Sequence, residues 1–170
     1  MYEYQFLVDE VELLHVYERF TAGDIWWAFY HDYEGMTRQR WLATARADGV
    51  GIIGGYVDRK LGGVMTIQPF RNKVMTLCAE IGVAACREYF GEAEPLSRGA
   101  FMWAFDRLDC ASMVGFIPVS NRHSLRMAPR VGFHELCRIP KVCWYEKRQR
   151  FEDGVLVCAT PESVTKASEV

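Results

Sequence analysis

The chain has 170 residues, of which 50% are hydrophobic and 14% aromatic, so one domain with a packed core is expected and the disordered class is excluded. A formal net charge of −2 gives no electrostatic basis for binding nucleic acid, and no apolar run approaches the roughly 20 residues that cross a membrane. Acidic residues near the N-terminus stand where a secretory signal needs basic ones, so we expect a cytoplasmic protein.

The six cysteines and four histidines are spread along the chain. The cysteines lie inside or beside apolar segments and form no C-x-x-C pair, so buried free thiols are expected in place of a disulfide framework. The histidines have no metal-ligand spacing between one another or with a cysteine, so no metal site is expected.

The first half of the chain predicts a strand, helices and then three strands. Residues 2–8 favour a strand, and residues 11–20 and 24–47 favour two helical regions, the second rich in aromatic residues and interrupted near its middle. Three β-rich runs follow, separated by three-residue polar links that are typical of antiparallel neighbours. These runs cover residues 50–57, 61–70 and 74–83, with Pro69 expected near a strand end.

The second half alternates helices and strands. We expect an irregular connection over residues 85–95, a helix at 96–108, a strand at 113–119, a helix at 121–131 and strands at 133–145 and 155–159, the last two joined by a turn at 152–154. Residues 161–170 form a polar C-terminal tail that is expected to fray. The order predicts one domain over residues 1–160, of the mixed α/β class: a mostly antiparallel sheet of about seven strands with helices on both faces.

The segment NRHSLRMAPRVGF, residues 121–133, is the most informative motif. Ser120 or Asn121 can cap a helix whose apolar positions share one face, and Gly132 can take the left-handed conformation that ends it before Phe133 begins a strand. An ordinary strand–helix–strand unit would show the same features. The segment also resembles the last helix and following strand of the GNAT superfamily of N-acetyltransferases, and the whole order of elements is similar to that family's order.

The resemblance implies a GNAT-like acyltransferase domain that uses acetyl-CoA as its acyl donor. Members of the family bind the CoA pyrophosphate with backbone N–H groups at a helix start, beside small residues that let the phosphates approach. The corresponding turn here runs from Arg87 through Gly91 and Glu92 to Ala93, with three residues between Arg87 and Gly91 where the family usually has two. A connector that only begins a helix is the alternative. Ser97-Arg98-Gly99 is a second candidate anion site.

The resemblance also assigns roles on the fourth strand and the last helix. Glu80 is the candidate base toward the acceptor amine, although a carboxylate paired on the polar face of the strand would look the same. The backbone around Ile81, Gly82 and Val83 would pair with the pantetheine arm, and Asn121 would help to position that arm.

One position departs from the family pattern. Ala128 stands where many members have the tyrosine that protonates the departing thiolate. Two functions are therefore kept open. The first is transfer of an acetyl group from acetyl-CoA to a primary amine of a small molecule or protein. The second is a non-catalytic interaction or particle-assembly module, of the kind found among phage genes. A homodimer is compatible with either function, and neither membrane nor nucleic acid is an expected partner.

Overall fold

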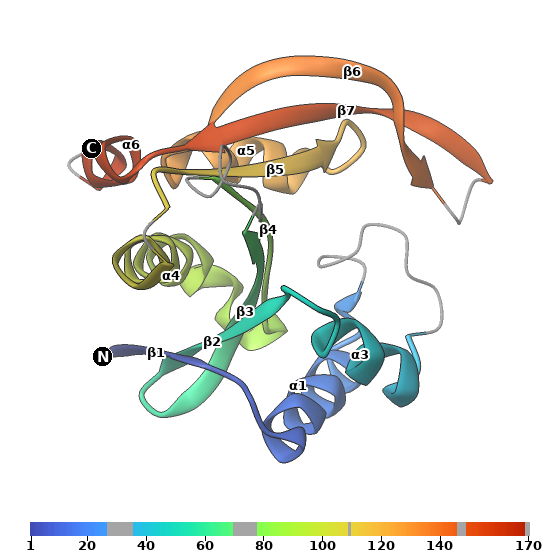
Figure 1. Ribbon diagram of the computed structural model, residues 1–170, viewed down its shortest axis with the longest axis vertical. Coiled ribbons are helices and arrows are strands. Elements are labelled where there is room, and N and C mark those ends of the chain that lie inside the picture. Colours follow the sequence, from blue (N-terminus) through green and yellow to red (C-terminus); the bar gives the residue numbers. More distant parts are fainter. Residues whose placement is uncertain (27–35, 70–77, 109, 146–148, 169–170) are drawn as a thin grey trace.

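The computed structural model describes residues 1–26, 36–69, 78–108, 110–145 and 149–168 (Figure 1). The elements follow in the order β1 (Tyr2–Phe6), α1 (Glu10–Ala22), α3 (Arg38–Ala45), β2 (Gly51–Val57), β3 (Lys60–Pro69), β4 (Cys78–Ala85), the 3₁₀ helix η1 (Arg87–Glu92), α4 (Ala93–Leu108), β5 (Ser112–Pro118), α5 (Arg122–Arg130), β6 (His134–Tyr145), β7 (Arg150–Ala159) and α6 (Pro161–Ala167). The predicted order of elements is confirmed, with one helix added at the end.

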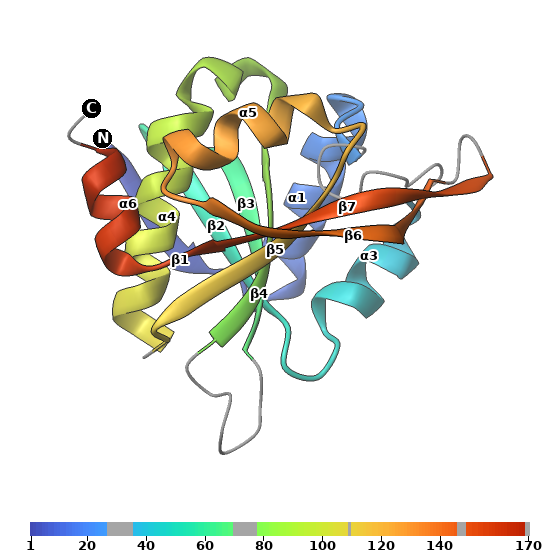
Figure 2. The same cartoon turned by 90° about the horizontal axis from the view of Figure 1, so that it is seen from above.

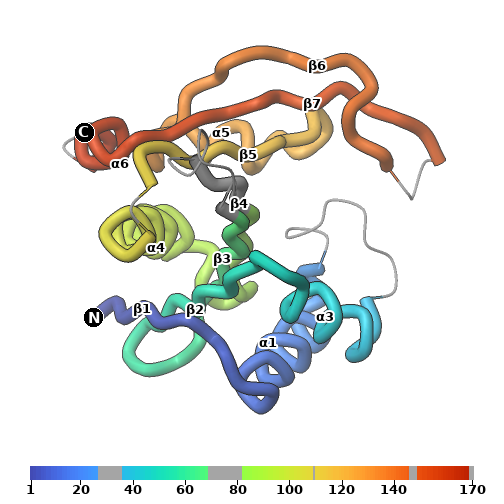
Figure 3. Tube along the Cα trace, viewed as in Figure 1, coloured from blue at the N-terminus to red at the C-terminus, as the bar shows by residue number. Residues whose placement is uncertain are grey.

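The strands form a seven-stranded sheet in the order β1-β2-β3-β4-β5-β7-β6. β4 and β5 are parallel, and the other neighbouring strands in this order are antiparallel. The mixed, mostly antiparallel sheet that the sequence predicts is therefore confirmed. In Figures 2 and 3 the far end of the β6–β7 hairpin projects beyond the rest of the sheet, on the side that carries α1 and α3.

Helices cover both faces of the sheet because neighbouring strand residues point to opposite sides. On β2, Ile52 packs against α1 and α3, while Ile53 belongs to the core under α4, α5 and α6. On β3, Val64 and Met65 divide between the two cores in the same way. Figure 2 shows α4 and α6 on one side of the sheet and α1 and α3 on the other.

The hairpin of β6 and β7 corrects one predicted turn. We expected the chain to turn at residues 152–154, but β7 already begins at Arg150 and runs through them. Trp144 and Phe151 are cross-strand partners whose ring centroids lie 5.0 Å apart, and Cys143 pairs with Glu152 in the register. These cross-strand contacts extend the ladder past the acidic residues that resemble a turn in the sequence.

The C-terminal residues correct a second prediction. Residues 161–167 form helix α6 where we expected a frayed tail. Thr160 and Ser163 form a capping box in which each side chain accepts a hydrogen bond from the other's backbone N–H. Val164 is 1% exposed and packs in the core with α4 and α5. The cap and this buried valine hold a segment that is otherwise polar.

The start of α4 was also predicted too late. We expected an irregular connection up to Pro95, but η1 covers Arg87–Glu92 and α4 begins at Ala93. Proline is tolerated in the first turn of a helix because the N–H group it lacks has no partner inside the helix there.

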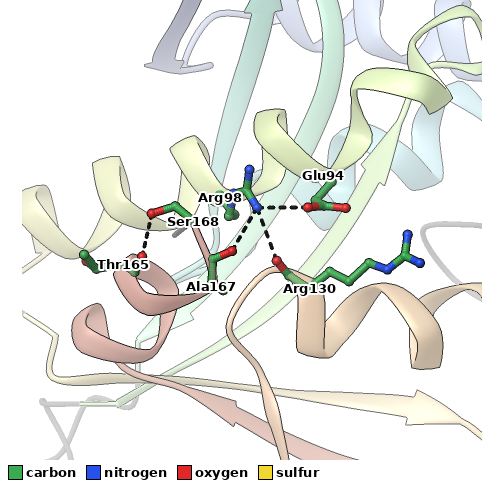
Figure 4. A network of polar contacts seen from close by, with 6 residues as sticks. All are labelled: Glu94, Arg98, Arg130, Thr165, Ala167 and Ser168. Carbon is green, nitrogen blue, oxygen red and sulfur yellow. Dashed lines mark hydrogen bonds and ion pairs between the residues drawn. The ribbon is translucent and has the colours of Figure 1, made fainter. Parts of the chain in front are cut away.

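Arg98 joins the ends of three helices (Figure 4). Its guanidinium lies 2.9 Å from Glu94 in the same helix and donates to the carbonyl oxygens of Arg130, at 3.4 Å, and Ala167, at 3.3 Å. These carbonyls lie at the C-terminal ends of α5 and α6, where a positive charge is favourable.

Arg98→Met should lower the free energy of unfolding by about 2 kcal/mol, since hydrogen bonds to charged groups contribute about 1.5–3 kcal/mol. Arg46→Met is the matched control, because Arg46 forms an exposed ion pair with Glu10 and should lose less than about 1 kcal/mol. Urea unfolding of both variants measures the difference. Equal losses would show that Arg98 adds no more than an ordinary surface charge.

Candidate active site

The sheet opens between β4 and β5. The two strands pair in parallel only from Cys78 opposite Ser112 to Glu80 opposite Val114. Beyond this point β4 continues to pair with β3 as far as Ala85, and β5 continues to pair with β7 as far as Pro118. The C-terminal parts of two adjacent strands are therefore unpaired with each other, which leaves a gap within the sheet.

One edge of β4 turns its backbone toward this gap. The Cys86 N–H donates to the Gly62 carbonyl oxygen at 2.8 Å, so Cys86 faces β3. Because the direction of the backbone groups alternates along an antiparallel strand, the N–H and C=O groups of Ile81, Val83 and Ala85 face away from β3. Those of Val83 and Ala85, which lie beyond the last pair with β5, can pair with an extended ligand in the gap.

A cavity of about 180 Å³ adjoins this edge. It lies between β4, η1, the first turns of α4 and the first turns of α5. Ser97 contributes a polar group from a residue that is only 4% exposed. The lining combines small and apolar residues with several polar ones: Val83, Ala84, Ala85, Phe90, Ser97, Asn121, His123, Ser124 and Met127.

Strand β1 holds the start of α4 beside this cavity. The Tyr2 hydroxyl donates to the Glu92 carboxylate, and the Tyr4 hydroxyl donates to the Leu96 carbonyl oxygen at 3.1 Å. Burial raises the pKa of Tyr4 to about 12, so this hydroxyl stays a donor at neutral pH. The Glu92 carboxylate is bound to β1, although its role toward a cofactor stays a prediction.

The turn before α4 contains an unconstrained glycine. A Cβ atom at Gly91 would meet no atom within 4 Å, and Gly91 is not among the residues with positive φ. Neither packing nor backbone conformation therefore requires glycine here. Arg87, at the start of the same 3₁₀ helix, is exposed. An exposed cation and open space beside a helix start suit an anionic ligand.

Two of the three glutamates around this turn pair with a cation. Each has a partner: Glu88 pairs with Arg19 of α1, Glu92 accepts from Tyr2 of β1, and Glu94 pairs with Arg98 one turn further along α4. Arg19 also lies beside Cys86, where burial raises the pKa of the thiol while the guanidinium opposes that change. Glu88 and Glu94 are thus less of an obstacle to a phosphate than the sequence suggests, whereas Glu92 keeps its negative charge because its partner hydroxyl is neutral.

Of the predicted site residues, Val83 and Asn121 line the cavity together, whereas Arg87, Gly91, Glu92 and Ala93 are not among its lining residues. Asn121 caps α5, because its side chain accepts from the Ser124 N–H at 3.1 Å, and it also lines the cavity. Glu80 occupies the last paired position before β4 and β5 part, while its side chain lies outside the described part of the structure. Residues 27–35 of the aromatic-rich helical region predicted at 24–47 also lie outside the described ranges.

One sequence-based interpretation is wrong, and the position of Ala128 limits another residue that could be placed there. The Ser97-Arg98-Gly99 anion site is excluded because Arg98 binds the C-terminal ends of α5 and α6, and a Cβ atom at Gly99 would lie 2.0 Å from the Tyr4 hydroxyl. Ala128 is buried in the core under the sheet and does not line the cavity, so a tyrosine there could not reach the gap without repacking.

Sequence reasoning missed some lining residues. Ser124 and Met127 follow Asn121 at intervals of three, which places them on one face of α5. That spacing was visible in the sequence and could have identified them. Ser97 was named in the sequence only as part of a second anion site, and its place at this cavity depends on how α4 packs against β4.

The cysteines described by the structure, Cys86, Cys110, Cys137, Cys143 and Cys158, are free thiols. Within the described ranges, no three histidine, cysteine or acidic side chains gather as a metal site would require. In the same part of the chain, no helix combines the length and apolarity needed to span a membrane.

Solved structures share this architecture. The spermidine N-acetyltransferase of Vibrio cholerae, in complex with CoA and spermine, superposes with a TM-score of 0.76 at 12% identity, over 96% of this chain and 98% of that one. The acetyl transferase of Salmonella typhimurium that modifies the N-terminal serine of 50S ribosomal subunit protein L7/L12 gives 0.74 at 15% identity, over 94% of both chains. A candidate acetyltransferase of Acinetobacter baylyi gives 0.70 at 22% identity, over 94% and 93%.

Comparison of the sequences, by contrast, found no match. No protein-family model matches the chain, and no curated protein matches it either. The structural likeness nevertheless extends over nearly the whole length of each chain. The protein therefore has the fold of the GNAT N-acetyltransferases.

Proposed function

We propose that this protein transfers an acetyl group from acetyl-CoA directly to a primary amine. The observation that carries the proposal is the gap between β4 and β5, with the backbone of Val83 and Ala85 directed into it and a cavity at its open end. In this reaction the amine nitrogen attacks the thioester carbonyl carbon, the carbon–sulfur bond breaks, and CoA leaves as the thiolate. A base must first take a proton from the ammonium, and Glu80 is our candidate for it.

The solved neighbours support both halves of the reaction. One neighbour holds CoA together with spermine, and another is a Salmonella typhimurium protein with its cofactor acetyl-CoA. Spermidine N-acetyltransferase acts on a small polyamine, whereas the L7/L12 enzyme modifies the terminal serine of a protein. An amine acceptor is the feature that these two activities share.

Residues of the site fit acetyl-CoA in several ways. The outward N–H and C=O groups of Val83 and Ala85 would pair with the amides of the pantetheine arm, as an added strand would. The backbone near Gly91 is the candidate site for the pyrophosphate, with Arg87 nearby in the sequence to balance its charge, whereas the Ala93 N–H already donates to the Phe90 carbonyl oxygen. Ser97 and Asn121 add polar contacts at the cavity wall.

Amide exchange measured by NMR with and without acetyl-CoA tests this proposal at single residues. Saturating ligand should slow the exchange of the Val83 and Ala85 amides, which face the gap. The intervening Ala84 amide faces β3 and is the matched control, so its exchange should change much less. Equal effects at the three residues, or none, would mean that the ligand does not pair with this edge of β4.

Gly91 gives a second, graded test. Gly91→Ala and Gly91→Val should leave the free energy of unfolding within about 0.5 kcal/mol of the wild type, because the space around a Cβ atom is open. Their affinity for acetyl-CoA should fall with side-chain size, by about tenfold for valine, which corresponds to about 1.4 kcal/mol. Calorimetric titration measures the affinity. Unchanged affinity in both variants would remove Gly91 from the cofactor site.

The buried Ala128 cannot supply an acid to the gap, and this is the observation that favours the non-catalytic alternative. A thermal-shift titration with acetyl-CoA separates the two functions, since a ligand that binds only the folded state raises the melting temperature. No shift at saturating acetyl-CoA, together with no transfer to a panel of amines, would favour an interaction module.

A further inference from the structure

Strands β5 and β7 carry apolar side chains on the face of the sheet where α1 and α3 pack against β2 and β3. Alternate residues of β5 and β7 belong to the core under α4, α5 and α6: Met113, Val155, Val157 and Ala159. Because side chains alternate along a strand, Val114, Phe116 and Leu156 point to the opposite face. Within the described ranges, none of these three is part of either core, and Phe116 is 41% exposed.

The strand register connects these residues to the position of the candidate base. Val114 is the partner of Glu80 on one side and of Cys158 on the other. Phe116, two residues further along β5, is the partner of Leu156. Because two residues of a strand span about 6.6 Å, the apolar side chains begin beside the Glu80 position and continue along the gap by about that distance.

A glycine on β7 lets this apolar surface extend toward β6. Gly154 lies two residues from Leu156 and therefore on the same face. A Cβ atom at Gly154 would lie 3.9 Å from the Phe116 ring and 2.5 Å from a methyl carbon of Val142, which is 40% exposed. The side chains of Phe116 and Val142 thus both lie over Gly154. We call Val114, Phe116, Val142 and Leu156 the apolar wall.

On the other side of the gap, β4 leaves space beside the apolar wall. Ala84 packs in the core with α1 and α3, so Gly82, two residues before it, lies on the same face. In the described chain, a Cβ atom at Gly82 would meet one atom within 4 Å, the Thr66 hydroxyl oxygen at 2.9 Å. A molecule that lies against the wall would therefore meet no side chain from this position of β4.

We propose that the apolar wall binds the body of the acceptor, and that the acceptor is a primary amine with an apolar group a few bonds from its nitrogen, as in an arylalkylamine. The nitrogen would lie near Glu80 and Val114, and the ring would lie against Phe116 and Leu156. The products are the N-acetylated amine and CoA. The inference rests on the proposed function for the chemistry, whereas binding to the wall does not depend on acetyl transfer.

The character of the wall distinguishes between classes of amine. Removing the carbon atoms of a ring from water against this surface is favourable. A polyamine would place a second ammonium group there, which would lose water without gaining a carboxylate from the wall. An apolar amine should therefore be a better acceptor than a polyamine.

Acetyl transfer to phenethylamine and to ethanolamine, measured with the full chain, tests the proposal. The two amines have similar basicity, and they differ in whether a ring or a hydroxyl group follows the same short linker. The kcat/KM value should be about tenfold higher for phenethylamine, since its ring is removed from water at the wall. Equal values for the two amines, or a higher value for spermidine than for phenethylamine, would overturn the proposal.

Variants test whether the wall causes this preference. Phe116→Ala should lower the ratio of the two kcat/KM values about fivefold. Phe151→Ala is the matched control, because Phe151 is 58% exposed and lies five residues from Leu156, on the opposite face of β7. Phe116→Glu should raise kcat/KM for spermidine relative to phenethylamine, because it places a carboxylate on the wall. Equal effects of Phe116→Ala and Phe151→Ala would contradict the assignment.

Sedimentation of the wild type and of Phe116→Ala tests the other occupant that an apolar surface could have. A wild-type dimer that Phe116→Ala converts to monomers would assign the wall to a second copy of the chain and overturn the proposal. The same oligomeric state in both proteins would support it.

NMR titration with phenethylamine, in the presence of CoA and without it, separates this inference from the proposed function. The amide signals of Val114, Phe116 and Leu156 should shift more than that of Phe151. If amines are acetylated but phenethylamine neither shifts these signals nor is preferred, the acetyltransferase proposal stands and the inference is wrong. If phenethylamine shifts them but no amine is acetylated, the binding site stands and the acetyltransferase proposal falls. If neither occurs, both fall.

Discussion

Gly132→Ala is expected to lower the free energy of unfolding by about 3 kcal/mol or more and to displace helix α6. Gly132 has a φ of 95°, in the left-handed region where a side chain is strained. A Cβ atom would also lie 2.5 Å from the Val164 Cα atom and 2.7 Å from its nitrogen. Because these are backbone atoms, the clash cannot be relieved by rotating a side chain. Urea unfolding measures the loss.

A truncation separates the two causes. Removal of residues 161–170 takes away α6 and with it the atoms that the new Cβ would meet. In this shortened chain, Gly132→Ala should lower the free energy of unfolding by only about 1–2 kcal/mol, which is the effect of backbone strain alone. Equal losses in the full and shortened chains would show that the contact with α6 is not the source of the effect.

Gly132 also illustrates what the sequence could predict. The capped helix, the left-handed glycine and the strand that follows are local features, since each depends on residues within a few positions of one another. They are confirmed by Asn121 as the cap of α5, by the φ of Gly132 and by β6. The order of the elements follows from similarly local patterns.

Helix α6 was missed for a physical reason. Its sequence is polar, and the capping residues are Thr160 and Ser163 where the usual signature has glutamate or glutamine at the second position. The helix depends on Val164, which packs in the core formed with α4 and α5. A single apolar residue gives no periodicity, so only the tertiary contact shows that this segment is ordered.

The candidate site was predictable only in part. Asn121 was found because it belongs to a local motif, whereas the gap depends on where β4 and β5 cease to pair, 34 residues apart in the register. Arg98 was misassigned because its partners Arg130 and Ala167 lie 32 and 69 residues away along the chain. Neither the end of the β4–β5 pairing nor the hydrogen bonds of Arg98 can be inferred from residues nearby in the sequence.

Glu80→Gln is expected to reduce turnover roughly 100-fold, with little change in the affinity for acetyl-CoA, because general-base assistance is typically of this size. Glu80 stands opposite Val114 at the last parallel pair before the gap opens, which is where we propose that a bound thioester meets the amine. Single-turnover transfer measured across a pH range, together with calorimetric titration of acetyl-CoA, separates a loss of chemistry from a loss of binding.

Glu135→Gln is the matched control for this change. Glu135 is an exposed carboxylate on β6 that pairs with Arg138 at 3.0 Å, and that guanidinium holds the pKa of the carboxyl below its usual range. Its loss should leave turnover unchanged, since β6 is the edge strand of the sheet and does not line the gap. If Glu80→Gln retains wild-type turnover at every pH, Glu80 is a structural carboxylate and the base must lie elsewhere. If the variant loses turnover and acetyl-CoA affinity together, Glu80 contributes to the binding of the cofactor and its assignment as the base is wrong.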